Sequence, residues 1–340
     1  MSSSQSPFAD IADTVFIKGH GTQNDFVLLA DDDSDLEMHP ETIALLADRR
    51  SGLGSDGVIR IVRSASSGIP GAQEQAEAGA EWFMDYYNHD GSLSEMCGNG
   101  VRVFAHVLVT TGRVAADARE ILVGTRDGIK TVRTVLNPAL GKQAGDSIAT
   151  APSAPSAPSA PSARTLPGSA GDAWYMIDMG EWSLDDSDDV LVSTSGIEVP
   201  RPGMRVETGN PHTVVALAES AELESAELRD APVLDPVPPQ GSNIEYIVME
   251  PARSDVAGGE GALRMRVFER GVGETRSCGT GACAAAIAAH HWAGPASPLQ
   301  WRVDVPGGQL RIGITPNEDG TRGSVTLSGP AVLVASGTIS

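Results

Sequence analysis

Cysteine is scarce in this chain of 340 residues, which contains only Cys97, Cys278 and Cys283. Three cysteines cannot form the disulfide framework that stabilises small secreted proteins. The opening Met-Ser-Ser-Ser-Gln-Ser-Pro also lacks the basic region and the apolar core of a signal peptide. We therefore expect a protein of the reducing cytoplasm.

Basic residues are also few, because 24 Lys and Arg face 45 Asp and Glu and give a net charge of −21. This balance argues against nucleic acid and anionic membrane surfaces as partners. No apolar run is long enough to cross a bilayer. Histidine, cysteine and carboxylate side chains show no metal-ligand spacing, so we expect no metal. Five histidines are expected to pack or hydrogen-bond locally: His20, His89, His106, His290 and His291.

The chain does contain two cysteines that each open an apolar segment behind glycines. Cys97-Gly-Asn-Gly precedes residues 101–108, and Cys278-Gly-Thr-Gly precedes residues 282–289; neither segment has much of a polar face. A helix that is apolar all round must be surrounded by other elements. Cys283 lies inside the second segment and is expected to be a core residue.

These cysteines sit where helix chemistry favours proton transfer. The first turn of a helix has free N–H groups and a partial positive charge, which lower the pKa of a thiol placed there. Glycines let the backbone approach a ligand, and the free N–H groups bind carboxylate. Two such helix starts facing each other would place Cys97 and Cys278 on opposite faces of one α-carbon. That geometry suits a racemase or epimerase that works without a cofactor.

Residue spacing indicates an internal repeat. Cys278 follows Cys97 by 181 residues, and Asn210 follows Asn24 by 186. Glu269 precedes its cysteine by nine positions, as Asn88 precedes Cys97. We predict an α+β fold with two pseudo-symmetric domains, each a curled mixed or antiparallel sheet around a central apolar helix.

Apolar periodicity places the remaining elements. It predicts strands at 14–18, 26–29, 58–62, 82–87, 121–123, 129–136, 174–179, 204–217 (two strands around a turn), 243–249, 263–268, 301–305, 308–314 and 324–327, and helices at 40–50 and 218–229. Residues 64–80 lack a pattern and are expected to be an insertion at a hairpin tip. Residues 145–171 include four copies of Ala-Pro-Ser, which predict an extended segment, either a domain linker or a loop insertion.

Five motifs follow one another in order along the chain: Gly21-Thr-Gln-Asn24-Asp-Phe, Asn88-His-Asp-Gly-Ser, Glu95-Met-Cys97-Gly-Asn-Gly-Val-Arg, Gly209-Asn210-Pro-His212 and Glu269-Arg-Gly-Val-Gly-Glu-Thr-Arg-Ser-Cys278-Gly-Thr-Gly. In these motifs the chain resembles the diaminopimelate epimerase family. The resemblance implies cofactor-independent interconversion of L,L- and meso-diaminopimelate, with Cys97 donating a proton, Cys278 accepting one, and the roles exchanged in reverse.

The resemblance also implies a set of substrate-binding residues: Asn24, Asn88, Gly98, Asn99, Asn210, Asn243, Glu269, Arg270, Gly279 and Thr280. His212 and Glu269 resemble family residues that tune thiol ionisation. Many members carry glutamine at the position of Gly57, so this chain lacks one contact. Asparagine also tolerates the conformations of turns, so Asn24, Asn88 and Asn210 could instead hold local structure.

The family resemblance further implies a cytoplasmic homodimer whose last strand returns to the first domain. We therefore predict a first domain at 1–172 plus 327–340 and a second at 173–326. Two other functions remain open. A proline or hydroxyproline racemase would share the fold, and a non-catalytic binding module would also, although the retention of both cysteines argues against a module.

Overall fold

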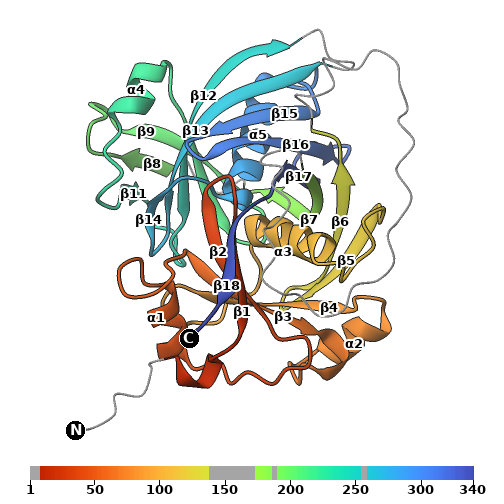
Figure 1. The fold of residues 1–340 in the computed structure, drawn as a ribbon. Helices are drawn as coiled ribbons and strands as arrows, with labels where there is room; N and C mark the ends of the chain where they lie inside the picture. Colours follow the sequence, from red (N-terminus) through yellow and green to blue (C-terminus); the bar gives the residue numbers. More distant parts are fainter. Residues whose placement is uncertain (1–7, 138–172, 186–189, 254–258) are drawn as a thin grey trace, which may run out of the picture.

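The computed structural model describes residues 8–137, 173–185, 190–253 and 259–340. The expectations for the first seven residues and for the insertion at 145–171 lie outside this part of the chain. The described residues form an 18-stranded sheet and a few helices (Figure 1). The predicted α+β class is confirmed.

The first half of the sheet curls around helix α3 (Gly98–Thr110), which contacts strands on several sides. Its strands, in hydrogen-bonding order, are β18 (Val332–Thr338), β1 (Val15–Gly21), β2 (Asn24–Ala30), β3 (Gly57–Arg63), β4 (Trp82–Asn88), β5 (Glu120–Thr125), β6 (Gly128–Val135) and β7 (Trp174–Leu184).

The second half repeats this arrangement around helix α5 (Gly279–Ala293). Its strands, in hydrogen-bonding order, are β9 (Arg201–Glu207), β10 (Pro211–Ala216), β12 (Asn243–Arg253), β13 (Glu260–Glu269), β15 (Gln300–Val305), β16 (Gly308–Pro316) and β17 (Arg322–Pro330). Three short strands lie beside them: β8 (Val190–Ser193), β11 (Val233–Asp235) and β14 (Gly273–Thr275).

Strand directions show how closely the halves correspond. From β1 to β7 the successive pairings are antiparallel, parallel, antiparallel, parallel, antiparallel and antiparallel. From β9 to β17 the order is the same. The spacing-based prediction of a structural repeat is therefore confirmed at the level of topology.

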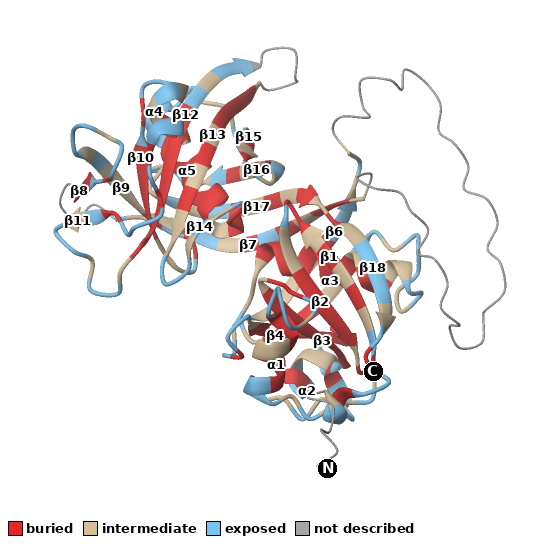
Figure 2. Cartoon of the chain, turned by 60° about the vertical axis from the view of Figure 1, so that its left-hand side comes forward, coloured by how far each residue is buried: buried red, intermediate tan, exposed pale blue. Residues whose placement is uncertain are grey.

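Strands β7 and β17 join the two halves. They pair with each other antiparallel over most of their length, and β7 also pairs with β6 and β9. Figure 2 shows this pair running between the two lobes. Val135 of β6 pairs with Trp174 of β7, so the described strands on either side of residues 138–172 are neighbours in the sheet.

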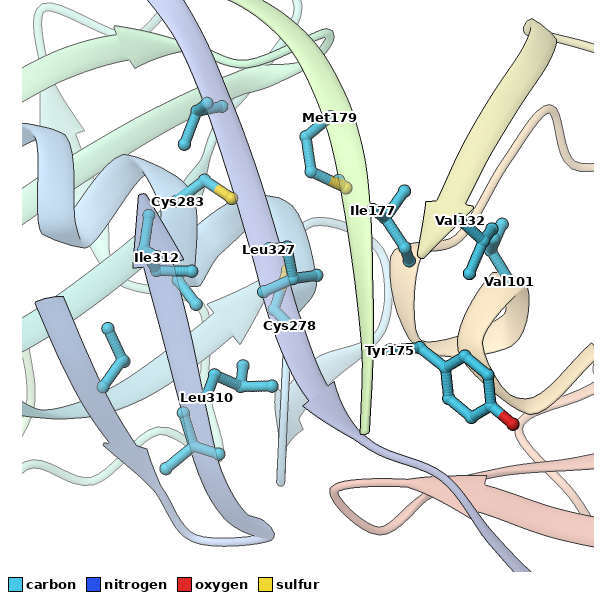
Figure 3. Close-up of a cluster of buried hydrophobic side chains, with 14 of the residues drawn as sticks. Val101, Val132, Tyr175, Ile177, Met179, Cys278, Cys283, Leu310, Ile312 and Leu327 are labelled. Carbon is cyan, nitrogen blue, oxygen red and sulfur yellow. The ribbon is translucent and has the colours of Figure 1, made fainter. Parts of the chain in front are cut away.

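One apolar cluster passes through both halves. Residues 282–289 of α5 have no exposed surface, and Leu327 of β17 packs between the helices (Figure 3). Met179 and Ile177 of β7 lie on the other side of that strand, facing α3. Each buried leucine or isoleucine contributes about 2 kcal/mol. The same apolar burial therefore fixes both cysteine-bearing helices against one central pair of strands.

Helix α1 (Pro40–Ala47) ends before the predicted residue 50. The carboxylate of Asp48 accepts hydrogen bonds from the backbone N–H groups of Arg50 and Ser51, at 2.9 and 2.7 Å. Such an Asx turn offers the backbone an alternative to further helix. The helix expected at 218–229 is also shorter, because α4 spans only Ser220–Ser225. Arg266 donates to the carbonyls of Leu223 and Ala226 at its end.

Residues 64–80 do connect two antiparallel strands, β3 and β4, as expected of a hairpin insertion. They are not patternless, however. They form the short helices η2 (Ser64–Ser66) and α2 (Ala72–Glu77), and Ala72 packs against Val62 and Phe83. A third short helix, η1 (Ala9–Ile11), precedes β1. The predicted first domain includes residues 327–340. Strand β18 does pair with β1 of the first half, whereas residues 327–330 belong to β17 of the second half. The division into domains stays a prediction.

Candidate active site

A two-residue turn between β1 and β2 brings the first predicted site residue to α3. Thr22 and Gln23 both have positive φ, at 51° and 64°, which non-glycine residues rarely adopt. The turn places Asn24 so that its Oδ1 accepts a hydrogen bond from Asn99 Nδ2 at 3.1 Å and lies 3.7 Å from Cys97 Sγ. Asn24 Nδ2 donates to Asp56 at 2.8 Å. Positive φ angles at non-glycine residues, such as those of Thr22 and Gln23, are often found at functional sites.

Cys97 and Cys278 occupy the same place in the two halves. Each is the N-cap of its helix, with extended backbone angles: φ −143° and ψ 119° for Cys97, φ −124° and ψ 121° for Cys278. The helix starts meet directly, since a Cβ added to Gly279 would lie 3.7 Å from Gly98 Cα. Leu327 packs against both glycines, since a Cβ at Gly98 or Gly279 would lie 3.0 or 3.2 Å from its Cδ2. The two thiols therefore sit at the junction of the halves.

Polar contacts hold this junction together. The hydroxyls of Thr22 and Ser277 are 2.6 Å apart, and both residues are buried. Asn99 Nδ2 also lies 3.4 Å from the backbone oxygen of Ser277. Farther out, Arg276 Nε donates to the side chain of Gln23 at 2.5 Å. Residues just before Cys278 are thus bound to the turn that carries Asn24.

The ionisation of the thiols differs from the sequence-based prediction. A helix N-terminus predicts a lowered pKa, but burial raises the pKa of Cys97 and raises that of Cys278 well above its usual value. The negative charge of Glu269 raises both pKa values further, and Glu245 adds to the effect at Cys278. Backbone N–H groups oppose these shifts, including that of Gly281 at 3.4 Å from Cys278 Sγ, but they are outweighed. Burial therefore favours the neutral thiol form of both cysteines.

His212 and Glu269 lie on the side of the second half. His212 is fully buried, with Nδ1 2.7 Å from Glu245 Oε1 and Nε2 3.0 Å from Asn210 Oδ1. These contacts fix the orientation of the imidazole. Burial raises the pKa of Glu269, whereas a hydrogen bond from Thr275 and the charge of His212 lower it. The charge of His212 thus lowers the pKa of Glu269, a residue whose own charge raises the pKa of both thiols.

The other predicted binding residues are already engaged with protein groups. Asn88 Nδ2 donates to Ser92 at 3.0 Å. Asn243 Oδ1 accepts from the backbone N–H of Arg270 at 2.9 Å, and the exposed Arg270 guanidinium donates to the carbonyl of Gln240. Thr280 lies beside Cys278, with Oγ1 3.6 Å from Sγ. Asn88 thus lies at the end of β4 and Asn243 at the start of β12, and hydrogen bonds to other protein groups hold both side chains.

Arg102 is a site residue that the sequence reasoning left without a role. It is fully buried, and its guanidinium donates to Gly98 O at 3.2 Å and to Asn99 Oδ1 at 2.6 Å. Burial lowers its pKa to about 10, and its positive charge lowers the pKa of Cys97. Its counterpart in the second half is Cys283, which has no exposed surface, as predicted for a core residue; burial raises its pKa to about 12.

Other residues at the junction were also missed. Glu245 could have been found, because a charged residue inside an otherwise apolar strand is uncommon. Thr22 and Ser277 carry no such signal, since their contact joins residues 255 positions apart.

A cavity of about 460 Å³ adjoins His212. It is lined also by Arg205, Glu207 and residues 238–242, but by neither of the two candidate catalytic cysteines.

Within the part of the chain that the structure describes, no three His, Cys, Asp or Glu side chains are grouped to hold a metal ion. Among those same residues, no helix combines the length and apolar character needed to cross a membrane. Three of the remaining histidines have hydrogen-bond partners: His20 with Gln23 and His290 with Pro298 nearby in sequence, and His106 with Tyr175 of β7.

The repeated strand-wrapped helix defines a fold seen in a class of isomerases and related proteins. A PhzF-family phenazine biosynthesis protein of Bacillus anthracis superposes with a TM-score of 0.64 at 14% identity, over 96% of this chain and 99% of that one. A hydroxyproline epimerase of Agrobacterium vitis superposes with a TM-score of 0.54 at 11% identity, over 96% and 92%. At these identities the likeness shows the fold alone.

Sequence comparison identifies the family within this class. Residues 16–137 and 204–334 match the family model of diaminopimelate epimerase. The diaminopimelate epimerase of Streptomyces coelicolor is 40% identical over 330 residues, covering 95% of this chain and 94% of that protein. The one from Thermobifida fusca is 41% identical over 326 residues, covering 95% and 97%. The chain belongs to the diaminopimelate epimerase family and is an isomerase.

Proposed function

We propose that this protein epimerises L,L-diaminopimelate to meso-diaminopimelate with Cys97 and Cys278 as the two proton-transferring groups and without a cofactor. The observation that carries the proposal is the meeting of two cysteine-capped helix starts, with Gly98 and Gly279 in near contact. The relatives with 40% identity are diaminopimelate epimerases, which supports the choice of substrate.

The chemistry follows from this geometry. The reacting carboxylate binds to the N–H groups of the two helix starts, which stabilise the charge that develops at the α-carbon. One sulfur, as thiolate, takes the α-proton from one face, and the other, as thiol, gives a proton to the opposite face. The number of protons on the pair is unchanged, so the reverse reaction exchanges the roles of Cys97 and Cys278. The proposed working form is a cytoplasmic homodimer.

The proposed distal contacts lie at or directly next to strand ends in the two halves. Asn24 and Asn88 belong to the first half, and Asn210, Asn243 and Arg270 to the second. Their amide and guanidinium groups can form directed hydrogen bonds to the second amino-acid centre of the substrate. Recognition of that centre distinguishes diaminopimelate from a cyclic amino acid with one centre.

Substrate preference tests the proposal directly. The purified protein should incorporate solvent deuterium at the α-carbon of L,L-diaminopimelate and produce the meso isomer, both detectable by NMR and chiral chromatography. The value of kcat/KM should exceed that for L-proline or trans-4-hydroxy-L-proline by about 10⁴-fold, because a site built to hydrogen-bond the distal centre discriminates strongly against a substrate that lacks it. A preference for either proline substrate would instead favour the racemase alternative.

The dependence of kcat/KM on pH should follow the ionisation of the two thiols. Catalysis requires one thiolate, and burial holds the pKa of Cys97 and of Cys278 above its usual value. Because kcat/KM reports ionisation of the free enzyme, it should rise between pH 7 and pH 9, by up to about tenfold per pH unit. α-Proton exchange measured across this range would check the slope.

Folded stability provides the control for the pH series. A thiol whose pKa is raised by folding favours unfolding only once the unfolded thiol ionises, at about pH 8.5 and above. The thermal midpoint should therefore stay constant from pH 7 to 8 and decline slightly toward pH 9. A flat kcat/KM profile with constant stability would show that the reactive thiolate already exists at pH 7.

A further inference from the structure

Position 57 of this chain belongs to the site but carries no side chain. Gly57 opens β3, and its register partner in β4 is Asn88. The corresponding first residue of β12 in the second half is Asn243, which reaches Arg270 through its side chain. Because Asn243 is a proposed substrate contact, the symmetry of the fold predicts a second contact at position 57, and glycine has no side chain to supply it.

The ring of Tyr86 fills the space beside Gly57. A Cβ added at Gly57 would lie 2.5 Å from Tyr86 Cε2 and 3.1 Å from the Tyr86 hydroxyl oxygen. Contacts below 3.0 Å require one group to move. The ring is fixed from the other side by Phe26, with centroids 5.8 Å apart and planes at 73° in an edge-to-face arrangement. Glycine at 57 and tyrosine at 86 thus fit one another.

The Tyr86 side chain lies on the same side of the sheet as Cys97, because it belongs to the apolar cluster that Cys97 packs against. Its hydroxyl lies 3.1 Å from the position of a Cβ at Gly57, which directly follows Asp56, the residue bonded to Asn24 beside Cys97. Burial raises the pKa of Tyr86 well above its usual value, and the charges of Cys97, Glu269 and Asp56 raise it further. Tyr86 is only 7% exposed, yet its hydroxyl has no hydrogen-bond partner among the residues that the structure describes. Tyr87, by contrast, donates its hydroxyl proton to Asp85 at 2.9 Å.

We propose that the Tyr86 hydroxyl is a substrate-binding group that accepts a hydrogen bond from an ammonium group of the bound substrate. The carboxylates of Asp56 and Glu269 make the surroundings of the hydroxyl negative, which attracts an ammonium. Because this hydroxyl has no hydrogen bond to the protein, it can bond to substrate without first breaking one. Tyr86 in this way replaces the side chain that is missing at Gly57. The inference rests on the proposed epimerase function.

Tyr86→Phe tests the contact, because it removes one oxygen and leaves the ring that packs against Gly57 and Phe26. The KM for L,L-diaminopimelate should rise about tenfold, as expected for the loss of a hydrogen bond to a charged group. The kcat should stay within about twofold, since a bond present both before and during reaction affects binding only. The readouts are steady-state epimerisation and α-deuterium exchange.

Tyr87→Phe is the matched control, since it removes the neighbouring hydroxyl, which faces Asp85 away from the thiols. Its KM should equal that of the wild type. A Tyr86→Phe variant with wild-type KM, or with a reduced kcat at unchanged KM, would overturn the inference. The wild type is measured first: without turnover of diaminopimelate the epimerase proposal itself fails, whereas an active wild type and an unaffected variant refute only the role of Tyr86.

Discussion

Replacing Cys97 or Cys278 by serine should lower the rate of α-proton exchange by about 10³-fold or more, in line with the loss of a positioned acid or base. A serine hydroxyl is a far weaker acid than a thiol, so it cannot supply the base at neutral pH. The fold should persist, because serine is a preferred N-cap residue and both positions are N-caps. Deuterium incorporation into L,L-diaminopimelate measures the loss.

Cys283→Ala is the control for these two variants. Cys283 is fully buried in α5, five residues after Cys278, and its removal leaves the helix start unchanged. It should cost about 1 kcal/mol of unfolding free energy and leave kcat intact. If either serine variant retained the exchange rate of the control, the proposal of two thiols acting on one α-carbon would be rejected.

Most of the fold could be predicted from the sequence, because the spacing of its residues indicates the internal repeat. Residues 101–108 and 282–289 lack a polar face, and a helix of that kind has to be enclosed. The intervals between Asn24 and Asn210, and between the two cysteines, then indicate that the enclosure occurs twice. Matching strand directions in the two halves agree with this argument.

The ends of helices were harder to predict, because hydrogen bonds from particular side chains determine them. Apolar periodicity continues to about residue 50, but the carboxylate of Asp48 binds the N–H groups that would otherwise extend α1. The end of α4 is set by Arg266, a residue of a distant strand whose guanidinium binds the carbonyls of Leu223 and Ala226. Periodicity carries no information about such partners.

Site chemistry shows the same limit. The motifs identify Cys97 and Cys278, but the pKa of each thiol depends on burial and on Glu269, which lies 172 positions beyond Cys97. A local argument from the helix dipole therefore gave the wrong direction. Likewise, Gly57 in the sequence suggests only that a contact to substrate is lost. The structure adds that the Tyr86 ring fills the space that a side chain at position 57 would occupy.

Mild oxidation should abolish activity by joining Cys97 to Cys278. A disulfide needs Cβ atoms about 4 Å apart, and the glycines that follow the two cysteines are already in near contact. All three cysteines are free in the structure. With diamide as oxidant, the two thiols lose two protons and two electrons, which convert the azo group to a hydrazine. Full recovery is expected on addition of a phosphine reductant.

Peptide mass spectrometry of the inactivated protein should find the Cys97–Cys278 cross-link and leave Cys283 as a free thiol. Inactive protein in which both Cys97 and Cys278 are free would contradict the prediction. L,L-diaminopimelate should protect, because it would separate the two sulfurs. Since thiolate is the reactive species and burial raises both pKa values, inactivation should be slow at pH 7 and faster at pH 9. Oxidation and epimerisation should therefore share one pH dependence, because both begin with the same thiolate.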